Sequence, residues 1–357
     1  MSKETMVHLN THTLIGFTDK RGKAWHYRAD LQGAEPNHYA GAIPVADVQR
    51  RLFAWQAVPR RVAVEFPATL ETMTHLNDVG EPMRWAVQTD RQAVAPSDRD
   101  HVMGMFKDSY KLHQYDQWLL QNVATIVDDD LAISSAGLLR DGALAWVEVS
   151  VPETITTPEG VAFRPNLLAA TSFDGSLATT IKRTVQATVC DNTLAVAQRE
   201  KGQTVKIRHS SNSLGRITDV REALALVHST ADDFAAEVAQ LTQQAVSPLQ
   251  FKQVIDLVFP VSDSESRRAV TNAQNKIDQV MHLYRFDPRC QDWQGTAFGV
   301  LQTLNTWRHH EQGGLPGSTS AEKRAARANR NAYRAITGET QTADAEVAAI
   351  LASVLAG

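Results

Sequence analysis

The spacing of hydrophobic positions changes along this chain of 357 residues. Over roughly the first hundred residues, short apolar runs and aromatic side chains alternate with glycine and proline, which predicts short strands joined by turns. Apolar residues recur at helical spacing after Pro44 and predict a helix over residues 45–55. Further helical patterns predict helices over residues 97–107 and 115–127.

After residue 130 the hydrophobic period becomes two. Residues 131–139 and 144–151 flank Asp141-Gly142, a dipeptide that favours tight primed turns, and together they predict a β-hairpin. Residues 166–172 and 177–189 are two more extended runs bounded by turn residues. The pattern therefore predicts an antiparallel meander of at least four strands.

The last of these strands alternates strictly. Ile181 and Val185 lie on one face, whereas Lys182 and Thr184 lie on the other. We therefore predict one core face and one exposed, polar and partly basic face. A helix over residues 177–197 is the main alternative, because the boundary with the next segment is uncertain in the sequence.

The chain becomes helical after a further short strand. Predicted helices cover residues 230–245, 262–285, 293–310 and 322–335. The segment before the last of these is rich in glycine and serine and reads as a linker. The C-terminal segment carries an apolar stripe that is formed by Val347, Ile350, Leu351 and Leu355. This stripe needs a partner surface, in this chain or in a neighbour.

These patterns predict an α+β fold, with antiparallel hairpins packed against helices and a mainly helical C-terminal third. The expected organisation is an α+β core with a central antiparallel sheet over residues 1–228, a helical region packing on it over 229–311, a linker over 312–320, and a basic helix with an apolar tail over 321–357.

Composition narrows the possible functions. The net charge of −4 argues against a surface that is basic throughout. The two cysteines form no CxxC pair, so we expect neither a disulfide framework nor a zinc site. No apolar run resembles a signal peptide or a membrane span, and we expect a cytoplasmic protein that does not associate with membranes.

The sequence contains no recognisable catalytic motif. Nucleophile-elbow, phosphate-loop, dinucleotide and HExxH signatures are all missing, so we expect no enzyme activity, no cofactor and no bound metal. Asp128, Asp129 and Asp130 could help to bind a divalent cation, but such a charge run is typical of a solvated helix end. We interpret His309 and His310 as surface or capping residues, and Cys190 as a small buried residue.

Two basic segments stand out in this acidic chain. Residues 181–216 hold seven lysines and arginines against two acidic residues, and the basic helix near the C-terminus holds five against one. Such side chains can contact phosphates without reading bases, although they could equally keep a sheet soluble. The predicted DNA contacts are Lys182, Arg183, Lys201, Lys206, Arg208 and Arg216, with a possible second basic patch at Lys323, Arg324, Arg327, Arg330 and Arg334.

Several local motifs resemble a known family. They include Thr171-Ser172-Phe173-Asp174-Gly175-Ser176, Cys190-Asp191-Asn192-Thr193-Leu194, Ile207-Arg208-His209-Ser210 and Gly295-Thr296-Ala297-Phe298-Gly299. These motifs look like the phage/plasmid-like family known as domain of unknown function 932. The strand meander followed by helices is also similar in layout to RecT/Redβ/Erf-type single-strand annealing proteins. The resemblance implies a protein of phage or plasmid origin acting in DNA recombination.

The sequence therefore leads to one hypothesis and two alternatives. The hypothesis is a homo-oligomeric protein, a ring or a filament, that binds and anneals single-stranded DNA and can work with an exonuclease or host replication partner. One alternative is a metal-dependent nuclease using residues 128–130 with a distant histidine. The other is a structural or host-interaction protein of a mobile element.

Overall fold

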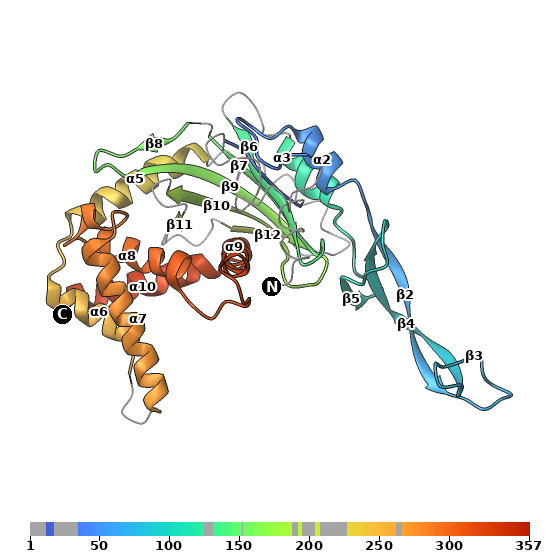
Figure 1. The fold of residues 1–357 in the computed structure, drawn as a ribbon. Helices are drawn as coiled ribbons and strands as arrows, with labels where there is room; N and C mark the ends of the chain where they lie inside the picture. Colours follow the sequence, from blue (N-terminus) through green and yellow to red (C-terminus); the bar gives the residue numbers. More distant parts are fainter. Residues whose placement is uncertain are drawn as a thin grey trace.

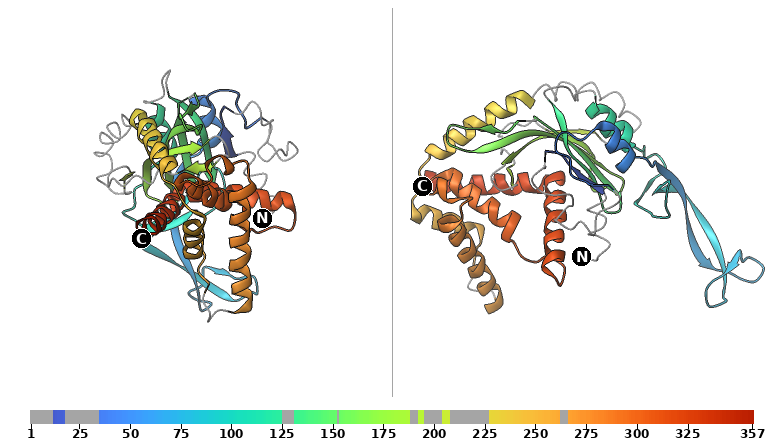
Figure 2. Two further views of the ribbon diagram at one scale, coloured as in Figure 1. Left: turned by 90° about the vertical axis from the view of Figure 1, so that its left-hand side faces the viewer. Right: turned by 45° about the horizontal axis from the view of Figure 1, so that its top comes forward.

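The computed structural model describes residues 12–17, 35–124, 131–151, 153–187, 192–194, 204–207, 227–261 and 266–357. They form a curved antiparallel sheet with helices on both of its faces (Figure 1). A long β-ribbon extends from one end of this body, and a group of helices lies at the other end (Figure 2). The α+β fold predicted from the sequence is confirmed.

The larger sheet contains the predicted meander. Its strands are β1 (Thr13–Ile15), β6 (Ala132–Leu139), β7 (Leu144–Ser150), β8 (Ile155–Thr156), β9 (Ala162–Ser172), β10 (Thr179–Ala187), β11 (Asn192–Leu194) and β12 (Thr204–Ile207). They lie in the order β1-β6-β7-β9-β10-β11, with β8 beside β9 and β12 beside β10, and every pairing is antiparallel. The strand prediction for the β10 segment is thus confirmed, and its helical alternative is wrong.

The β6–β7 hairpin turns where Asp-Gly was noted in the sequence. Arg140 and Asp141 both have φ of 53°, and the N–H of Gly142 donates to the Leu139 carbonyl at 3.2 Å. Positive φ at both central residues is typical of the primed turns that match the twist of paired strands. The turn is therefore centred one residue earlier than the Asp-Gly dipeptide.

A smaller sheet forms the arm. Its strands are β2 (Ala57–Pro67), β3 (His75–Leu76), β4 (Pro82–Pro96) and β5 (Gly104–Lys107). β2 and β4 are much longer than the short strands expected in this region. The helix predicted over residues 97–107 is wrong, because Met105 and Phe106 pair with Ala93 and Gln92 of β4 as strand β5. Strand pairing here overrides the local helical pattern.

Helices cover one face of the larger sheet along its length. At one end lie α2 (Val45–Leu52), η4 (Asp116–Gln121) and α3 (Asn122–Ala124), whose apolar side chains share a core with Leu167 and Ala169 of β9. At the other end α5 (Val227–Gln243) places Phe234 against Phe163, with ring centroids 4.6 Å apart. The helices predicted over residues 45–55 and 230–245 are confirmed in position, as is the described part of the helix predicted over residues 115–127.

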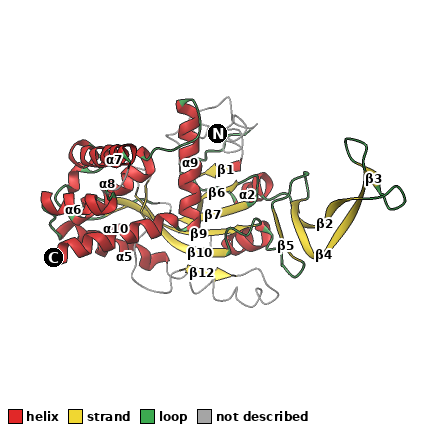
Figure 3. Cartoon of the chain, turned by 90° about the horizontal axis from the view of Figure 1, so that it is seen from below, coloured by secondary structure: helices red, strands yellow, loops and turns green. Residues whose placement is uncertain are grey.

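The opposite face of the sheet is covered by α9 (Ser320–Thr337), which crosses below the strands (Figure 3). Ile336 of α9 shares a core with Leu168 of β9 and Trp146 of β7. Thr180 and Thr184 of β10 point to this face and are buried. The exposed polar face predicted for β10 is therefore wrong, because a helix some 140 residues later in the chain covers it.

The C-terminal helices form a second core. They are α6 (Pro248–Val258), α7 (Arg267–Phe286), η6 (Gln291–Trp293), α8 (Ala297–Thr306), η7 (Trp307–Glu311) and α10 (Glu339–Ala356). Val347 and Leu351 of α10 are buried in it, so the apolar C-terminal stripe finds its partner surface within this chain. The sequence did not predict α6. α7 is capped by the Ser266 hydroxyl, whereas the predicted capping box over 262–265 lies outside the described residues.

Candidate functional site

Two helices meet at a sharp corner beside the larger sheet. α9 begins with a capping box, in which Thr319 Oγ1 accepts from the backbone N–H of Glu322 and the Glu322 carboxylate accepts from that of Thr319. It ends at Gly338, whose φ of 89° lies in the left-handed region. Because α10 starts at the next residue, its first turn lies close to the last turns of α9 and η7.

Lys182 of β10 holds the end of α9. Its ammonium donates to the carbonyl oxygens of Ala335 at 2.5 Å and Ile336 at 2.9 Å, and to Gln341 Oε1 at 3.3 Å. The last carbonyls of a helix lack partners within it and carry the negative end of its dipole, so a cation stabilises them. The side chain is only 6% exposed. We predicted Lys182 as an exposed phosphate contact, and that exposure is wrong because α9 covers it.

One face of α9 carries a row of cationic side chains. Steps of four, three and four residues place on one helical stripe Lys323, Arg327, Arg330 and Arg334. At 1.5 Å per residue the row spans about 16 Å. Lys323 is exposed and the arginines are partly buried. The Nε atoms of Arg327 and Arg330 are buried and have no hydrogen-bond partner among the described residues. We call this row the α9 cationic row.

Arg330 fixes the segment that follows η7. Its guanidinium donates to the carbonyl oxygens of Gln312 and Gly313, each at 3.3 Å, and to that of Arg308 at 3.2 Å. The predicted linker over residues 312–320 is therefore held against α9 at its first residues. Because all three acceptors are neutral carbonyls, they leave the charge of Arg330 unbalanced.

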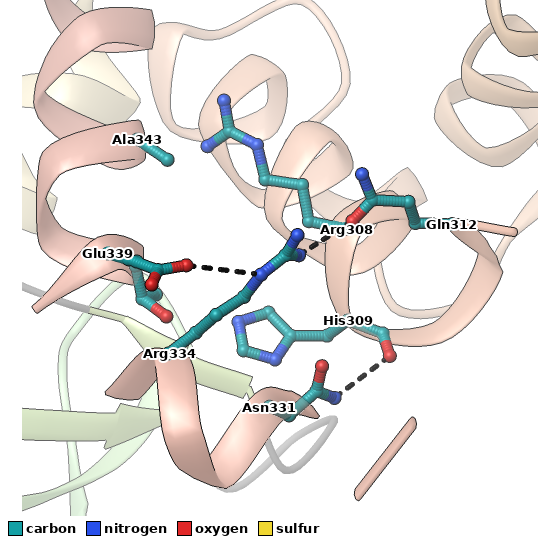
Figure 4. A pocket seen from close by; sticks show the side chains of 8 residues that line it. Arg308, His309, Gln312, Asn331, Arg334, Glu339 and Ala343 are labelled. Carbon is teal, nitrogen blue, oxygen red and sulfur yellow. Dashed lines mark hydrogen bonds and ion pairs between the residues drawn. The ribbon is translucent and has the colours of Figure 1, made fainter. Parts of the chain in front are cut away.

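An open pocket of about 240 Å³ lies between α9, η7 and α10 (Figure 4). It is lined by Arg308, His309, Gln312, Asn331, Arg334, Glu339, Thr340 and Ala343. Arg334 extends between the two sides of the pocket, donating to Gln312 Oε1 at 2.7 Å while its Nε lies 3.7 Å from Glu339 Oε2. The pocket thus presents guanidinium and amide groups rather than a deep apolar surface.

Burial and mutual repulsion act on the guanidinium groups of this corner. Arg308 pairs with Asp344 at 3.2 Å, and burial lowers the pKa of Arg308. Burial, followed by the repulsion of Arg334 and Arg327, lowers the pKa of Arg330 to about 10. Burial thus disfavours the charged form of both guanidinium groups, while Asp344 and Glu346 favour the charged form of Arg308.

His309 lies within the same group of charges. Its side chain is buried, and Asn331 Nδ2 donates to its backbone carbonyl at 3.0 Å. Burial, followed by repulsion from His310 and the nearby arginines, lowers the pKa of His309 to about 4. His309 is thus neutral at pH 7, and it is not the surface histidine that we expected. The guanidinium groups of this corner come from Arg308, Arg330 and Arg334, and the nearby carboxylates come from Glu339, Asp344 and Glu346.

The structure tests the predicted basic stripe only in part. β10 and β12 are neighbours as expected, with Thr180 opposite Lys206 and Lys182 opposite Thr204. The structure describes the backbone but not the side chains of Arg183 and Lys206. Three further residues of the stripe lie wholly outside the described residues, namely Lys201, Arg208 and Arg216. Apart from the buried Lys182, the stripe stays a prediction.

The second basic patch is brought together with residues that the sequence did not single out. Lys323 and Arg324 are exposed, and Arg327, Arg330 and Arg334 lie along α9 as predicted for a basic helix. Sequence reasoning missed Arg308, Gln312, Asn331 and Glu339 as neighbours of this helix. The sequence does show Arg308 at the end of a predicted helix, just before the predicted linker. No local pattern, however, indicates that this residue contacts α9.

Other candidate chemistry finds little support in the described part of the chain. Asp128, Asp129, Asp130 and Cys190 lie outside the described residues. Cys290 is buried, and burial raises the pKa of its thiol, which disfavours a nucleophilic thiolate. Among the described residues, no three His, Cys, Asp or Glu side chains gather as metal ligands would. Every helix in that part of the chain is too short or too polar to cross a lipid bilayer.

The fold and the corner site define an α+β protein with a cationic helix at the side of its sheet. Comparison with known families gives a match over residues 102–340 to the domain of unknown function DUF932. The match covers more than half of the chain, and the protein belongs to this family. It includes β6 to β12 and the whole of α9, so most of the candidate site falls within the family domain, whereas Ala343 and Asp344 of α10 lie just beyond the matched residues. No curated protein and no solved structure matches the chain.

Proposed function

We propose that this protein binds single-stranded nucleic acid along α9 and promotes strand annealing without covalent chemistry. One observation carries the proposal: the α9 cationic row runs from the exposed Lys323 to a pocket that is lined by the guanidinium groups of Arg308 and Arg334 and by one carboxylate, that of Glu339. A row of positive charges along one helix face is suited to a polyanion. Arginine is the side chain that binds phosphate oxygens in two-point contacts.

The dimensions of the row fit a short stretch of phosphate backbone. A span of about 16 Å along one helix face can neutralise about three phosphates of an extended strand. Arg324 is exposed one residue from the start of the row and can add a further contact. The contacts are all to charge, so we expect binding that is largely independent of sequence.

Annealing requires little more than this. A protein that holds the phosphate backbone leaves the bases accessible to a complementary strand, and pairing supplies the free energy. No nucleotide, metal or nucleophile is needed for such a step. The similarity in layout to single-strand annealing proteins and the phage and plasmid origin of the resembled family support placing this activity in DNA recombination.

The test is the affinity of purified protein for a labelled single strand, measured by fluorescence anisotropy. We expect the double substitution Lys323→Ala/Arg327→Ala to weaken binding about tenfold or more, since each phosphate contact is lost separately. A matched control is Arg267→Ala/Arg268→Ala, which removes two exposed cations from the start of α7. Equal affinity for both variants would contradict the assignment to α9, and tighter binding of duplex would contradict the single-strand preference.

A further inference from the structure

The arm leaves the body of the protein as a long ribbon built around β2 and β4 (Figures 1 and 2). Beyond Arg61 the register shifts, because Val62 pairs with Gln88 whereas Arg61 pairs with Gln92. From there to its tip the arm consists of β2 and β4, with the short β3 beside the last residues of β4. An isolated two-stranded ribbon is only marginally stable in water, so an arm of this length calls for a partner.

Both faces of the arm expose apolar side chains. Val64 and Phe66, which project from one face, are 40% and 43% exposed. Trp85 and Val87, which project from the other, are 52% and 44% exposed. Apolar surface on both faces of a protruding element is typical of an interaction site rather than of a solvated loop.

The outer edge of β2 is available for strand pairing. Among the described residues β2 pairs only with β4, so its other edge presents unpaired backbone N–H and C=O groups between Val58 and Phe66. Such an edge is a template for another strand unless charges or prolines block it. Here the prolines, Pro59 and Pro67, lie at the two ends of the edge and leave its centre open.

The sequence of this edge is complementary to itself. When two copies of β2 run antiparallel with Ala63 opposite Ala63, Val62 lies opposite Val64 and Arg61 lies opposite Glu65. Glu65 also pairs within its own arm, where its Oε1 lies 2.5 Å from His75 Nε2. Arg60 lies opposite Phe66, where a guanidinium can stack on the ring, and Pro59 lies opposite Pro67, where pairing ends. Every pair occurs twice across the axis, as an isologous interface requires.

We propose that two copies of this protein associate through β2, antiparallel about a twofold axis at Ala63, and form one continuous four-stranded ribbon. The apolar residues of both arms then share two common faces. The two Arg61–Glu65 ion pairs set the register, since a shift of two residues would break both of them.

The charge distribution along the arm supports the same arrangement. The tip, residues 68–81, carries Glu71, Asp78 and Glu81 and no lysine or arginine. Antiparallel association directs this tip towards the base of the other copy's arm. There an open pocket of about 380 Å³ is lined by Arg60, Arg99, Asp100 and His101 together with two apolar residues. An acidic tip thus approaches a pocket with two arginines and one aspartate, in which Arg99 also pairs with Asp98 at 2.9 Å.

The first test is a charge swap measured by sedimentation velocity over a dilution series. We expect a dimer for the unmodified protein, and about tenfold or greater weakening of dimerisation in Arg61→Glu, which places like charges opposite each other twice. The double variant Arg61→Glu/Glu65→Arg recreates both ion pairs with reversed polarity and should restore the dimer. All substituted positions are exposed, so the far-ultraviolet circular dichroism spectrum should stay that of the folded protein.

The second test locates the axis independently of charge. Ala63→Cys places two thiols across the twofold axis within disulfide distance, and mild oxidation should give a covalent dimer. The matched control is Ala86→Cys, also exposed but on β4, where the two thiols would lie more than about 14 Å apart. A monomer at every concentration, no rescue by the charge swap, or equal cross-linking at both positions would each overturn the proposal.

Discussion

The ammonium of Lys182 in β10 lies 2.9 Å from the carbonyl oxygen of Ile336 in α9, across 154 residues of chain. The bond ties the central sheet to the corner that carries the α9 cationic row. We expect Lys182→Met to leave helix-end carbonyls buried without a donor, and to lower the free energy of unfolding by about 1–3 kcal/mol. Urea denaturation measures this change. An unchanged free energy of unfolding would show that the lysine does not stabilise the corner.

The buried pair Arg308–Asp344 offers a second prediction. The two side chains are 20% and 11% exposed, and removal of one partner leaves the other charge buried and unpaired. Asp344→Ala should therefore lower the free energy of unfolding by about 3 kcal/mol. The matched control is Glu35→Ala, which breaks the exposed pair with Arg50 and should lower the free energy of unfolding far less. Similar losses in both variants would contradict the difference in burial.

His309 predicts a pH dependence of stability. Its pKa is lowered to about 4 in the folded protein, so between pH 6.5 and 4 the unfolded chain takes up a proton that the folded protein does not. The stabilisation is therefore complete above about pH 6.5 and is lost as the pH falls towards 4. We expect the free energy of unfolding of the unmodified protein to fall by an amount on the order of 2 kcal/mol over this interval, and that of His309→Gln not to show this fall. Parallel stability curves for the variant and the unmodified protein would contradict this.

Glu148 predicts a dependence of the opposite sign. It lies in β7 opposite Leu168, which in turn lies opposite Lys182, and burial raises its pKa to about 7. The folded protein keeps the proton that the unfolded chain releases above about pH 4.5, so stability falls as the pH rises from 4.5 through 7.

Glu148→Gln should therefore become more stable than the unmodified protein as the pH rises, by an amount on the order of 2 kcal/mol at pH 8, while the two should be similar at pH 4. Thermal denaturation at both pH values measures the difference. A constant difference between the two proteins would contradict a raised pKa of Glu148 in the folded protein.

The sequence predicted the meander well because its signals are local. Alternation in β6, β7, β9 and β10, with turn residues between them, is sufficient to define hairpins. The coverage of the sheet could not be predicted in the same way. Lys182 follows the pattern of an exposed strand residue, and only the packing of α9, far along the chain, buries it. The same long-range packing unites Arg308 with α9.

The arm shows a different limit of sequence reasoning. Its apolar and polar residues do not separate into an inner and an outer face, so periodicity gave only short strands. The prediction of a helix over residues 97–107 was wrong because Gly104–Lys107 forms a strand that pairs with β4. Segments whose structure depends on a partner strand carry weak local signals.

The salt dependence of binding tests the central claim most directly. The logarithm of the association constant for a single strand is measured against the logarithm of the salt concentration. For about three phosphate contacts along the α9 cationic row, we predict a slope of about −2, and a slope flatter by about 1.4 in Lys323→Ala/Arg327→Ala. A slope near zero, or one that these substitutions leave unchanged, would contradict phosphate binding by α9.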